Sequence, residues 1–177
     1  MHSHAKQMKN HGVLTLTSRH QIPFGKKTLL YRTLFPMDET QYHFLKNQSD
    51  CFLEMAFRTD RDERLYNADA YGKNTGECGD SIEIFLIIKQ GKIRSVSFGI
   101  DGCINTRASA NMLAELIENK TPAQAWAITP DDIADGLETL PEESYHCAEI
   151  AAGALYLALS HYRTINREPW KKNYMPR

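Results

Sequence analysis

Within residues 82–88, and again within 96–100, every second position is apolar, which is the period of a half-buried β-strand. The pattern predicts one strand over Ser81 to Lys89 and a second over Ile93 to Ile100, joined by a turn at Gln90-Gly91. The core-facing positions are Ile82, Ile84, Leu86 and Ile88 in the first strand, and Val96, Phe98 and Ile100 in the second. We therefore expect an antiparallel pair with one face in the core.

After Cys103 the spacing of apolar residues becomes helical and stays so to Asn119. Thr121-Pro122 and Thr129-Pro130 each place a capping threonine before a proline, so both should open short helices. A last helix is predicted from about Glu142 to His161. Strands followed by several helices predict an α+β fold, a small antiparallel β-sheet with helices packed on one face.

Upstream of the strands the pattern is less regular. A helix is predicted from Asp38 to about Arg58, and the polar stretch from Thr59 to Glu77 is predicted to be a loop. Residues 1–36 read as an extension of unknown role, with a possible β-hairpin formed by two β-branched or aromatic runs. We accordingly divide the chain into residues 1–36, a domain over 37–167, and a tail over 168–177.

Composition limits the classes of function. A net charge of −1 in 177 residues gives no electrostatic case for a nucleic-acid or membrane partner. No apolar run is long enough to span a bilayer, and residues 1–10 lack the apolar core of a secretory signal. The expected location is therefore the cytoplasm, where four cysteines are expected to be thiols or metal ligands instead of disulfides.

Three of the cysteines carry the candidate chemistry. Cys78 precedes the first strand, Cys103 ends the second, and Cys147 lies near the start of the last helix. Three thiols with the neighbouring His146 and Asp80 make a ligand set suited to a soft metal or an iron–sulfur cluster. Two of the thiols should lie at helix N-termini, where the macrodipole favours a thiolate. Cys51, within the first predicted helix, is expected to be a small buried hydrophobe.

The local geometry of this set can also be anticipated. His146 should project about 100° around the helix from Cys147, which suits joint ligation of an ion better than a Cys-His catalytic pair. Asp80, two residues after Cys78 on a segment expected to be extended, should point to the same side as that thiol. A hard oxygen donor among sulfurs weakens and opens a metal site.

Beyond the residue types, the contexts of the cysteines resemble those of the IscU/NifU-type iron–sulfur scaffold family. The resemblance covers roughly residues 65 to 165 and keeps all three cysteines in register. It is carried by Asn67-Ala68-Asp69-Ala70, Glu77-Cys78-Gly79-Asp80-Ser81, Gly91, Phe98, Asp101-Gly102-Cys103, Ala108-Ser109, Lys120-Thr121, Ile128-Thr129, Asp132-Ile133, Leu140-Pro141, His146-Cys147-Ala148-Glu149 and the helix ending at Tyr162.

The resemblance implies a scaffold, not an enzyme, on which a transient 2Fe–2S cluster is built and then handed to recipient apoproteins. Cys78, Cys103 and Cys147 would be the cluster ligands and the acceptors of sulfur from a cysteine desulfurase. Asp80 would be the carboxylate that makes the cluster labile, and His146 an alternative ligand. Zinc or ferrous iron can occupy such a site when no cluster is bound.

The chain departs from the family pattern in several places, among them the serine run after the middle cysteine, which is reduced to Ser109. The Gly-rich loop after the middle cysteine is Ile104-Asn105-Thr106-Arg107, whose bulk could alter loop flexibility and whose arginine could hold an anionic cluster. The Leu-Pro-Pro-Val-Lys stretch recognised by an Hsp70-type chaperone is Leu140-Pro141-Glu142-Glu143-Ser144. This charge reversal puts delivery through that chaperone in doubt.

Two other functions stay open. The same ligand set could hold zinc in a sulfur acceptor or carrier that works with a desulfurase and has sulfurtransferase-like activity. The altered loop after Cys103 also fits an interaction protein that has kept the fold and lost the activity.

Overall fold

The computed structural model of this chain describes residues 38–167. The chain divides into two units, Met1–Met37 and Asp38–Arg177, and the described residues belong to the second. The possible hairpin of the first 36 residues and the tail 168–177 lie outside the described residues. The elements in chain order are α2 (Glu39–Lys46), α3 (Asp50–Phe57), β1 (Ala70–Thr75), β2 (Ser81–Lys89), β3 (Lys92–Asp101), α4 (Ile104–Ile117), α5 (Pro122–Ala125), α6 (Pro130–Leu137), a 3-10 turn (Glu142–Ser144) and α7 (Tyr145–Arg167).

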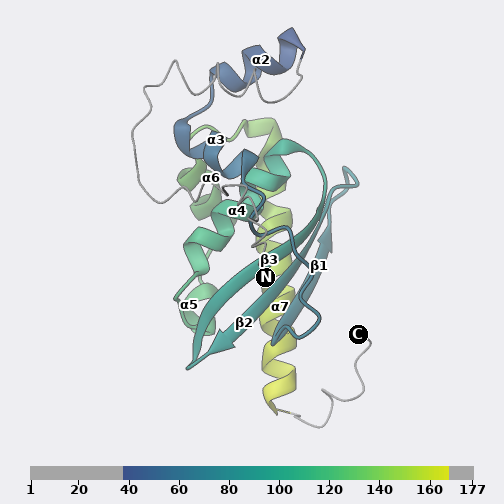
Figure 1. Ribbon diagram of the computed structural model, residues 1–177, viewed down its shortest axis with the longest axis vertical. Helices are drawn as coiled ribbons and strands as arrows, with labels where there is room; N and C mark the ends of the chain where they lie inside the picture. Colours follow the sequence, from purple (N-terminus) through teal and green to yellow (C-terminus); the bar gives the residue numbers. More distant parts are fainter. Residues whose placement is uncertain (1–37, 168–177) are drawn as a thin grey trace, which may run out of the picture. The chain divides into compact units, whose positions relative to one another are not determined.

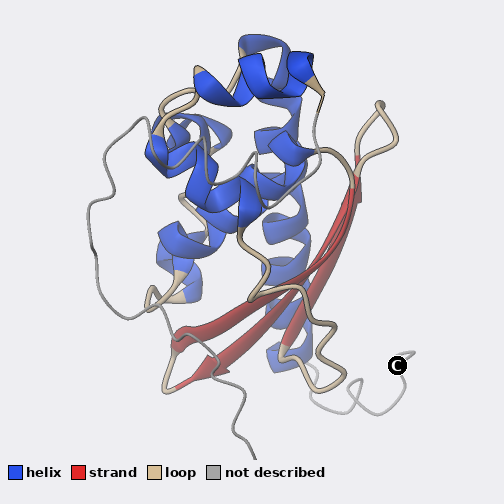
Figure 2. Cartoon of the chain, turned by 45° about the horizontal axis from the view of Figure 1, so that its top comes forward, coloured by secondary structure: helices blue, strands red, loops and turns tan. Residues whose placement is uncertain are grey.

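The fold is α+β, with one three-stranded antiparallel sheet in the order β1-β2-β3 and helices packed on one of its faces (Figures 1 and 2). This confirms the predicted fold class. The alternation seen in the sequence sets the register, because Ile84 of β2 lies opposite Phe98 of β3 and the central side chains on that face, Ile82, Ile84, Leu86, Val96 and Phe98, are buried. The register shifts between Ile87 and Ile88, close to the turn that joins β2 to β3.

The long helix α7 supplies most of the cover over the inner face of the sheet, and α4 packs between α7 and α3 (Figure 1). Both helices are rich in alanine on their buried sides, which lets backbones approach closely. The two predicted capping threonines, Thr121 and Thr129, each form a capping box with the residue three positions on. These features match the sequence prediction.

Two predictions for residues 38–77 were wrong. The single helix is broken into α2 and α3, because Ser49 caps α3: its hydroxyl accepts from the Phe52 N–H and donates to the Leu137 carbonyl of α6. The stretch predicted as loop contains β1, whose sequence AYGKNT has little strand propensity. Pairing with β2 and contact with α7 make it a strand despite its composition.

Within the described range 38–167, no helix has the length and apolar character needed to cross a bilayer.

The register of β2 and β3 places the residues of the functional site next to one another. Ser81 at the start of β2 lies opposite Asp101 at the end of β3, so the residues just outside these strands are neighbours. The chain enters α4 directly after β3, with Cys103 as the N-cap residue. The start of α7 reaches the same region, where the sulfur of Cys147 contacts Cys103 and Thr106. Three segments far apart in sequence therefore meet at one end of the sheet.

Candidate metal and sulfur site

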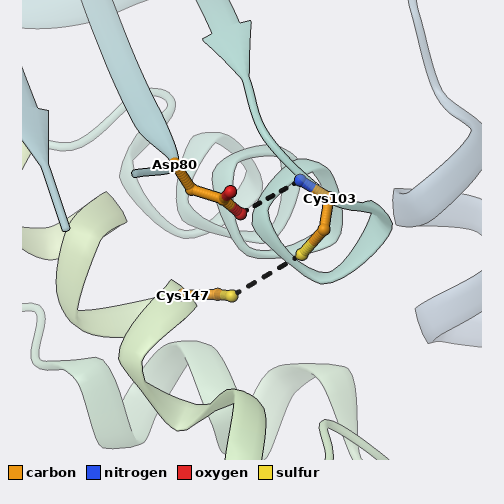
Figure 3. Close-up of side chains that lie close together, drawn as sticks. All are labelled: Asp80, Cys103 and Cys147. Carbon is orange, nitrogen blue, oxygen red and sulfur yellow. Dashed lines mark hydrogen bonds between the residues drawn. The ribbon is translucent and has the colours of Figure 1, made fainter. Parts of the chain in front are cut away.

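Asp80, Cys103 and Cys147 meet at this end of the sheet (Figure 3). One ligand atom from each lies within 4.8 Å of the others, and the two sulfurs are 4.0 Å apart. Two sulfurs bound to one tetrahedral ion stand about 3.8 Å apart, given metal–sulfur bonds of about 2.3 Å. The spacing of Cys103 and Cys147 therefore suits joint ligation of a thiophilic ion, with Asp80 as an oxygen donor.

Asp80 is held in place by two hydrogen bonds to the same oxygen. Its Oδ2 accepts the backbone N–H of Cys103 at 3.0 Å and the hydroxyl of Thr106 at 2.6 Å. These bonds lower the pKa of the Asp80 carboxyl, with the bond from the Cys103 backbone contributing most. The carboxylate is therefore ionised and oriented without any ion bound. Gly102 makes this approach possible, since a Cβ there would stand 2.9 Å from the Asp80 carboxyl carbon.

The protonation state of the Cys147 thiol differs from the one predicted from the sequence. Cys147 is the third residue of α7, as expected, but it is fully buried, and burial raises its pKa to about 12. Burial therefore outweighs the helix dipole, and the prediction of a thiolate favoured by the helix start was wrong for Cys147 in the metal-free protein. Binding a metal at this sulfur must displace its proton.

His146 lies beside Cys147 but outside the group of three whose ligand atoms lie within 4.8 Å of one another, and it turns its Nε2 toward the Cys147 sulfur. Its Nδ1 is 3.0 Å from the carbonyl oxygen of Glu143, and its Nε2 is 3.6 Å from the Cys147 sulfur. A carbonyl only accepts, so Nδ1 carries the proton of this bond and, in the neutral ring, Nε2 has the lone pair. This is the arrangement usual for a metal-binding histidine, whose other nitrogen donates to a fixed acceptor.

Cys78 stands apart from the other donors. It is exposed on the turn between β1 and β2, and its sulfur does not belong to the group of ligand atoms that lie within 4.8 Å of one another. The segment is not extended, because Gly79 adopts φ +91° and backbone bonds close the turn from Gly76 to Asp80. The prediction that strand alternation aligns Cys78 with Asp80 was therefore wrong.

A groove of about 620 Å³ is lined by the turn that carries Cys78 and by the start of α7. Its walls include Cys78 and Glu77 on the turn side and His146, Glu149 and Ile150 on the helix side. The exposed thiol therefore lines an open space that reaches the histidine beside the buried sulfur.

The residues that depart from the family pattern make specific contacts. Asn105 donates from Nδ2 to the Ser144 hydroxyl at 3.0 Å, which links the start of α4 to the 3-10 turn before α7. Arg107 forms an ion pair with Asp62. Its guanidinium is thus paired with a carboxylate of the segment that precedes β1.

Sequence reasoning missed the importance of Thr106. This side chain is fully buried in the first turn of α4, and its hydroxyl touches Asp80, Cys103 and Cys147. The available signal was its position three residues after Cys103, the spacing at which an N-cap residue and the first helical turn face each other. The fourth cysteine, Cys51, is remote from the group: its thiol contacts the Gly136 carbonyl at 3.2 Å.

Comparisons with known proteins agree with this fold. The family model of the NifU-like N terminal domain matches residues 60–169. A relative from Archaeoglobus fulgidus, named iron-sulfur cluster assembly scaffold protein IscU 1, is 33% identical over 100 residues, which are 56% of this chain and 65% of that protein. The iron-sulfur cluster assembly scaffold protein IscU of Escherichia coli is 32% identical over 88 residues, 49% of this chain and 68% of its own length.

One solved structure supports the fold alone. The N-terminal part of a nitrogen-fixing NifU-like protein from Brucella abortus superposes with a TM-score of 0.53 at 17% identity, covering 68% of this chain and 94% of that one. The chain spans just under two thirds of the length of the Archaeoglobus relative. The match to the family model nevertheless extends over more than half of this sequence, so the chain belongs to the family of NifU-like N-terminal domains.

Proposed function

We propose that this protein is a scaffold for iron–sulfur cluster assembly, which binds iron and sulfur at a three-cysteine site and passes a 2Fe–2S cluster to recipient apoproteins. The observation that carries the proposal is the 4.0 Å spacing of the Cys103 and Cys147 sulfurs beside an oriented Asp80. The names of the curated relatives, which are scaffold proteins for such clusters, support it.

In this proposal the cluster is cargo. Cys103 and Cys147 hold it from the helix side, and Cys78 joins from the turn across the groove, with His146 as the alternative donor. Asp80 supplies a hard oxygen among soft sulfurs, which favours a site that can release what it binds. The proteins that complete the cycle would be a cysteine desulfurase as sulfur source and apoproteins as recipients.

Delivery does not rest on the Hsp70-type chaperone in this proposal. The segment that would be recognised carries Glu142 and Glu143, both exposed on the 3-10 turn before α7. Two negative charges would meet a partner selected for an apolar and basic stretch, and such a mismatch weakens recognition.

Anaerobic reconstitution with ferrous iron and sulfide tests the proposal. The unmodified protein and a Cys51→Ser variant should develop the same visible chromophore with protein-bound iron and sulfide, and Cys103→Ser should lose most of it. The Cys51→Ser variant is a matched control, because it removes one thiol that lies against Gly136 and outside the donor group. A colourless unmodified protein, or an undiminished chromophore in Cys103→Ser, would contradict the scaffold.

A zinc-bound sulfur acceptor that works with a cysteine desulfurase is the second candidate. It is favoured by the count of donors, since Asp80, Cys103 and Cys147 plus either His146 or Cys78 complete a tetrahedral site. Elemental analysis of the purified protein, together with a persulfide assay in the presence of a desulfurase, separates the two. About one zinc per chain and a stimulated desulfurase support this function, and the absence of both removes it.

A further inference from the structure

Thr106 occupies the centre of the donor group. Its Oγ1 lies 2.6 Å from Asp80 Oδ2, 3.4 Å from the Cys103 sulfur and 3.3 Å from the Cys147 sulfur. The side chain is fully buried, so water does not compete for these contacts. One hydroxyl thus touches each of the three groups that would bind an ion.

The chemistry of the hydroxyl decides which contact dominates. A threonine has one proton to donate, and an ionised carboxylate can only accept. The short distance to Asp80 and the charge of that oxygen direct the proton to Oδ2. With its one proton on Asp80, Thr106 can accept a proton from the Cys103 thiol, and it cannot at the same time donate to the Cys147 sulfur, which lies 3.3 Å away in a position to receive that proton.

The hydrogen bond from Thr106 helps to orient the Asp80 carboxylate. Oδ2 takes both of its hydrogen bonds, one from Thr106 and one from the Cys103 backbone. Oδ1 takes part in neither, so the carboxylate is pinned by one oxygen while the other can turn to an ion. Carboxylate ligands in metal sites are commonly oriented by such a second hydrogen bond.

We propose that Thr106 is a positioning residue that fixes Asp80 for ion binding and so sets the affinity of the site. The inference rests on the proposed function, because it concerns the same ligands. It adds a residue that does not itself bind the ion, and it attributes the effect to the hydroxyl acting through Asp80.

The chain contains a matched control on the same helix. Ser109 stands one turn after Thr106 in α4 and is also fully buried. Its hydroxyl has no hydrogen-bond partner within the described part of the chain. Ser109→Ala therefore removes a buried hydroxyl from the same helix without touching the donor group.

The test is an anaerobic titration of the full-length metal-free chain with Co²⁺, followed by the sulfur-to-cobalt charge-transfer and ligand-field bands. Thr106→Val keeps the side-chain shape and removes the hydroxyl, and should weaken Co²⁺ binding by about 10- to 100-fold, the usual effect of losing an outer partner of a ligand. Thr106→Ser should restore most of the affinity, and Ser109→Ala should leave it unchanged. Thermal unfolding of each metal-free variant verifies that it folds; if Thr106→Val does not, Thr106→Ala takes its place.

A double-mutant cycle tests whether the effect runs through Asp80. In an Asp80→Ala background, Thr106→Val should weaken Co²⁺ binding by no more than about twofold further, because coupled residues lose the same interaction only once. Full additivity would overturn the inference, as would unmodified affinity in Thr106→Val or equal losses in the Val and Ser variants. An unmodified protein that takes up no Co²⁺ at these residues would overturn the proposed function as well.

Discussion

The donor set of this protein has two parts that differ in how they are held. Cys103 and Cys147 stand at the starts of α4 and α7, helices whose alanine-rich sides are packed into the core. Their sulfurs are 4.0 Å apart; Cys147 is fully buried, whereas Cys103 is exposed even though it starts a packed helix. Cys78 is exposed on the turn between β1 and β2, where Gly79 allows a conformation that other residues rarely adopt.

This difference suits a site that must both hold and release. Elements packed in a core keep ligand geometry fixed, whereas surface turns open at little free-energy expense. In the proposed scaffold, the helix side would fix the position of the cargo. The turn side would add the Cys78 thiol from the other wall of the groove.

The largest expected effect on metal affinity comes from replacing one cysteine at a time, first Cys147 at the helix start and then Cys78 on the turn. Cys147→Ser should lower Co²⁺ affinity by more than about 100-fold, beyond the usual loss for an outer partner, because it removes a preformed ligand. Cys78→Ser should lower it by about tenfold, since the ordering of the turn offsets part of that bond. Optical titration of both variants measures the two values. Equal losses would show that the turn is as well organised as the helix starts.

The thiol of Cys147 should react much more slowly in the native protein than in the unfolded chain. Because the native pKa is raised to about 12, little thiolate exists at pH 8, and alkylation should be about 100-fold slower than in denaturant. The native rate should keep rising from pH 9 to 11, where the unfolded thiol has levelled off. Time-resolved mass spectrometry of the metal-free protein follows both, with the exposed Cys78 and Cys103 modified before Cys147. Rapid native labelling of Cys147 would contradict its burial.

The same pKa shift predicts how stability responds to pH. The native Cys147 thiol keeps its proton to a higher pH than the unfolded one, so its contribution is fully present below the unfolded value, about 8.5, and is lost as pH rises toward 12. The melting temperature of the metal-free protein should therefore fall between pH 8 and 11, and fall less in Cys147→Ser. A parallel decline in both would assign the loss to other groups.

A smaller effect is expected from Gly102→Ala. The added Cβ would stand 2.9 Å from the Asp80 carboxyl carbon and displace the carboxylate from its bonds to Cys103 and Thr106. We expect about a tenfold loss of Co²⁺ affinity, the lower end of the range for outer partners. Gly79→Ala is the counterpart on the turn: nothing lies near its Cβ, so only backbone strain of about 1 kcal/mol should appear. Unchanged affinity in Gly102→Ala would mean that Asp80 is not a ligand.

The smallest effect should follow loss of the link between the two helix starts. Asn105→Ala removes the hydrogen bond to Ser144 and also a buried Asn105 carbonyl oxygen that has no partner in the described residues. Because these two changes oppose each other, the free energy of unfolding should change by about 1 kcal/mol or less. Denaturant unfolding measures it, and Co²⁺ affinity should fall by about threefold or less through looser spacing of the two cysteines. A loss as large as that of Gly102→Ala would make this link part of the ligand support.

Much of the fold could be predicted because its signals are local. Alternation along β2 and β3, the capping boxes at Thr121 and Thr129, and Cys103 as the start of a helix depend on neighbours a few residues away. The strand β1 could not be found this way, since its polar sequence becomes a strand only by pairing with β2. The break at Ser49 did have a local signal that the prediction overlooked, because the Ser49 hydroxyl caps α3 at the Phe52 N–H; its bond to the Leu137 carbonyl adds a contact from a residue remote in sequence.

The sequence by itself determined the inventory of the site: three cysteines, Asp80 and His146 in family register, at the ends of strands and helices. Only the tertiary structure decided how they divide, with Cys103, Cys147 and Asp80 together and both Cys78 and His146 outside that group. It also decided that burial governs the Cys147 thiol and that the Thr106 hydroxyl lies among the donors. Chain order fixes which groups are available, but distances below 5 Å between residues far apart in sequence arise from packing, which no local pattern encodes.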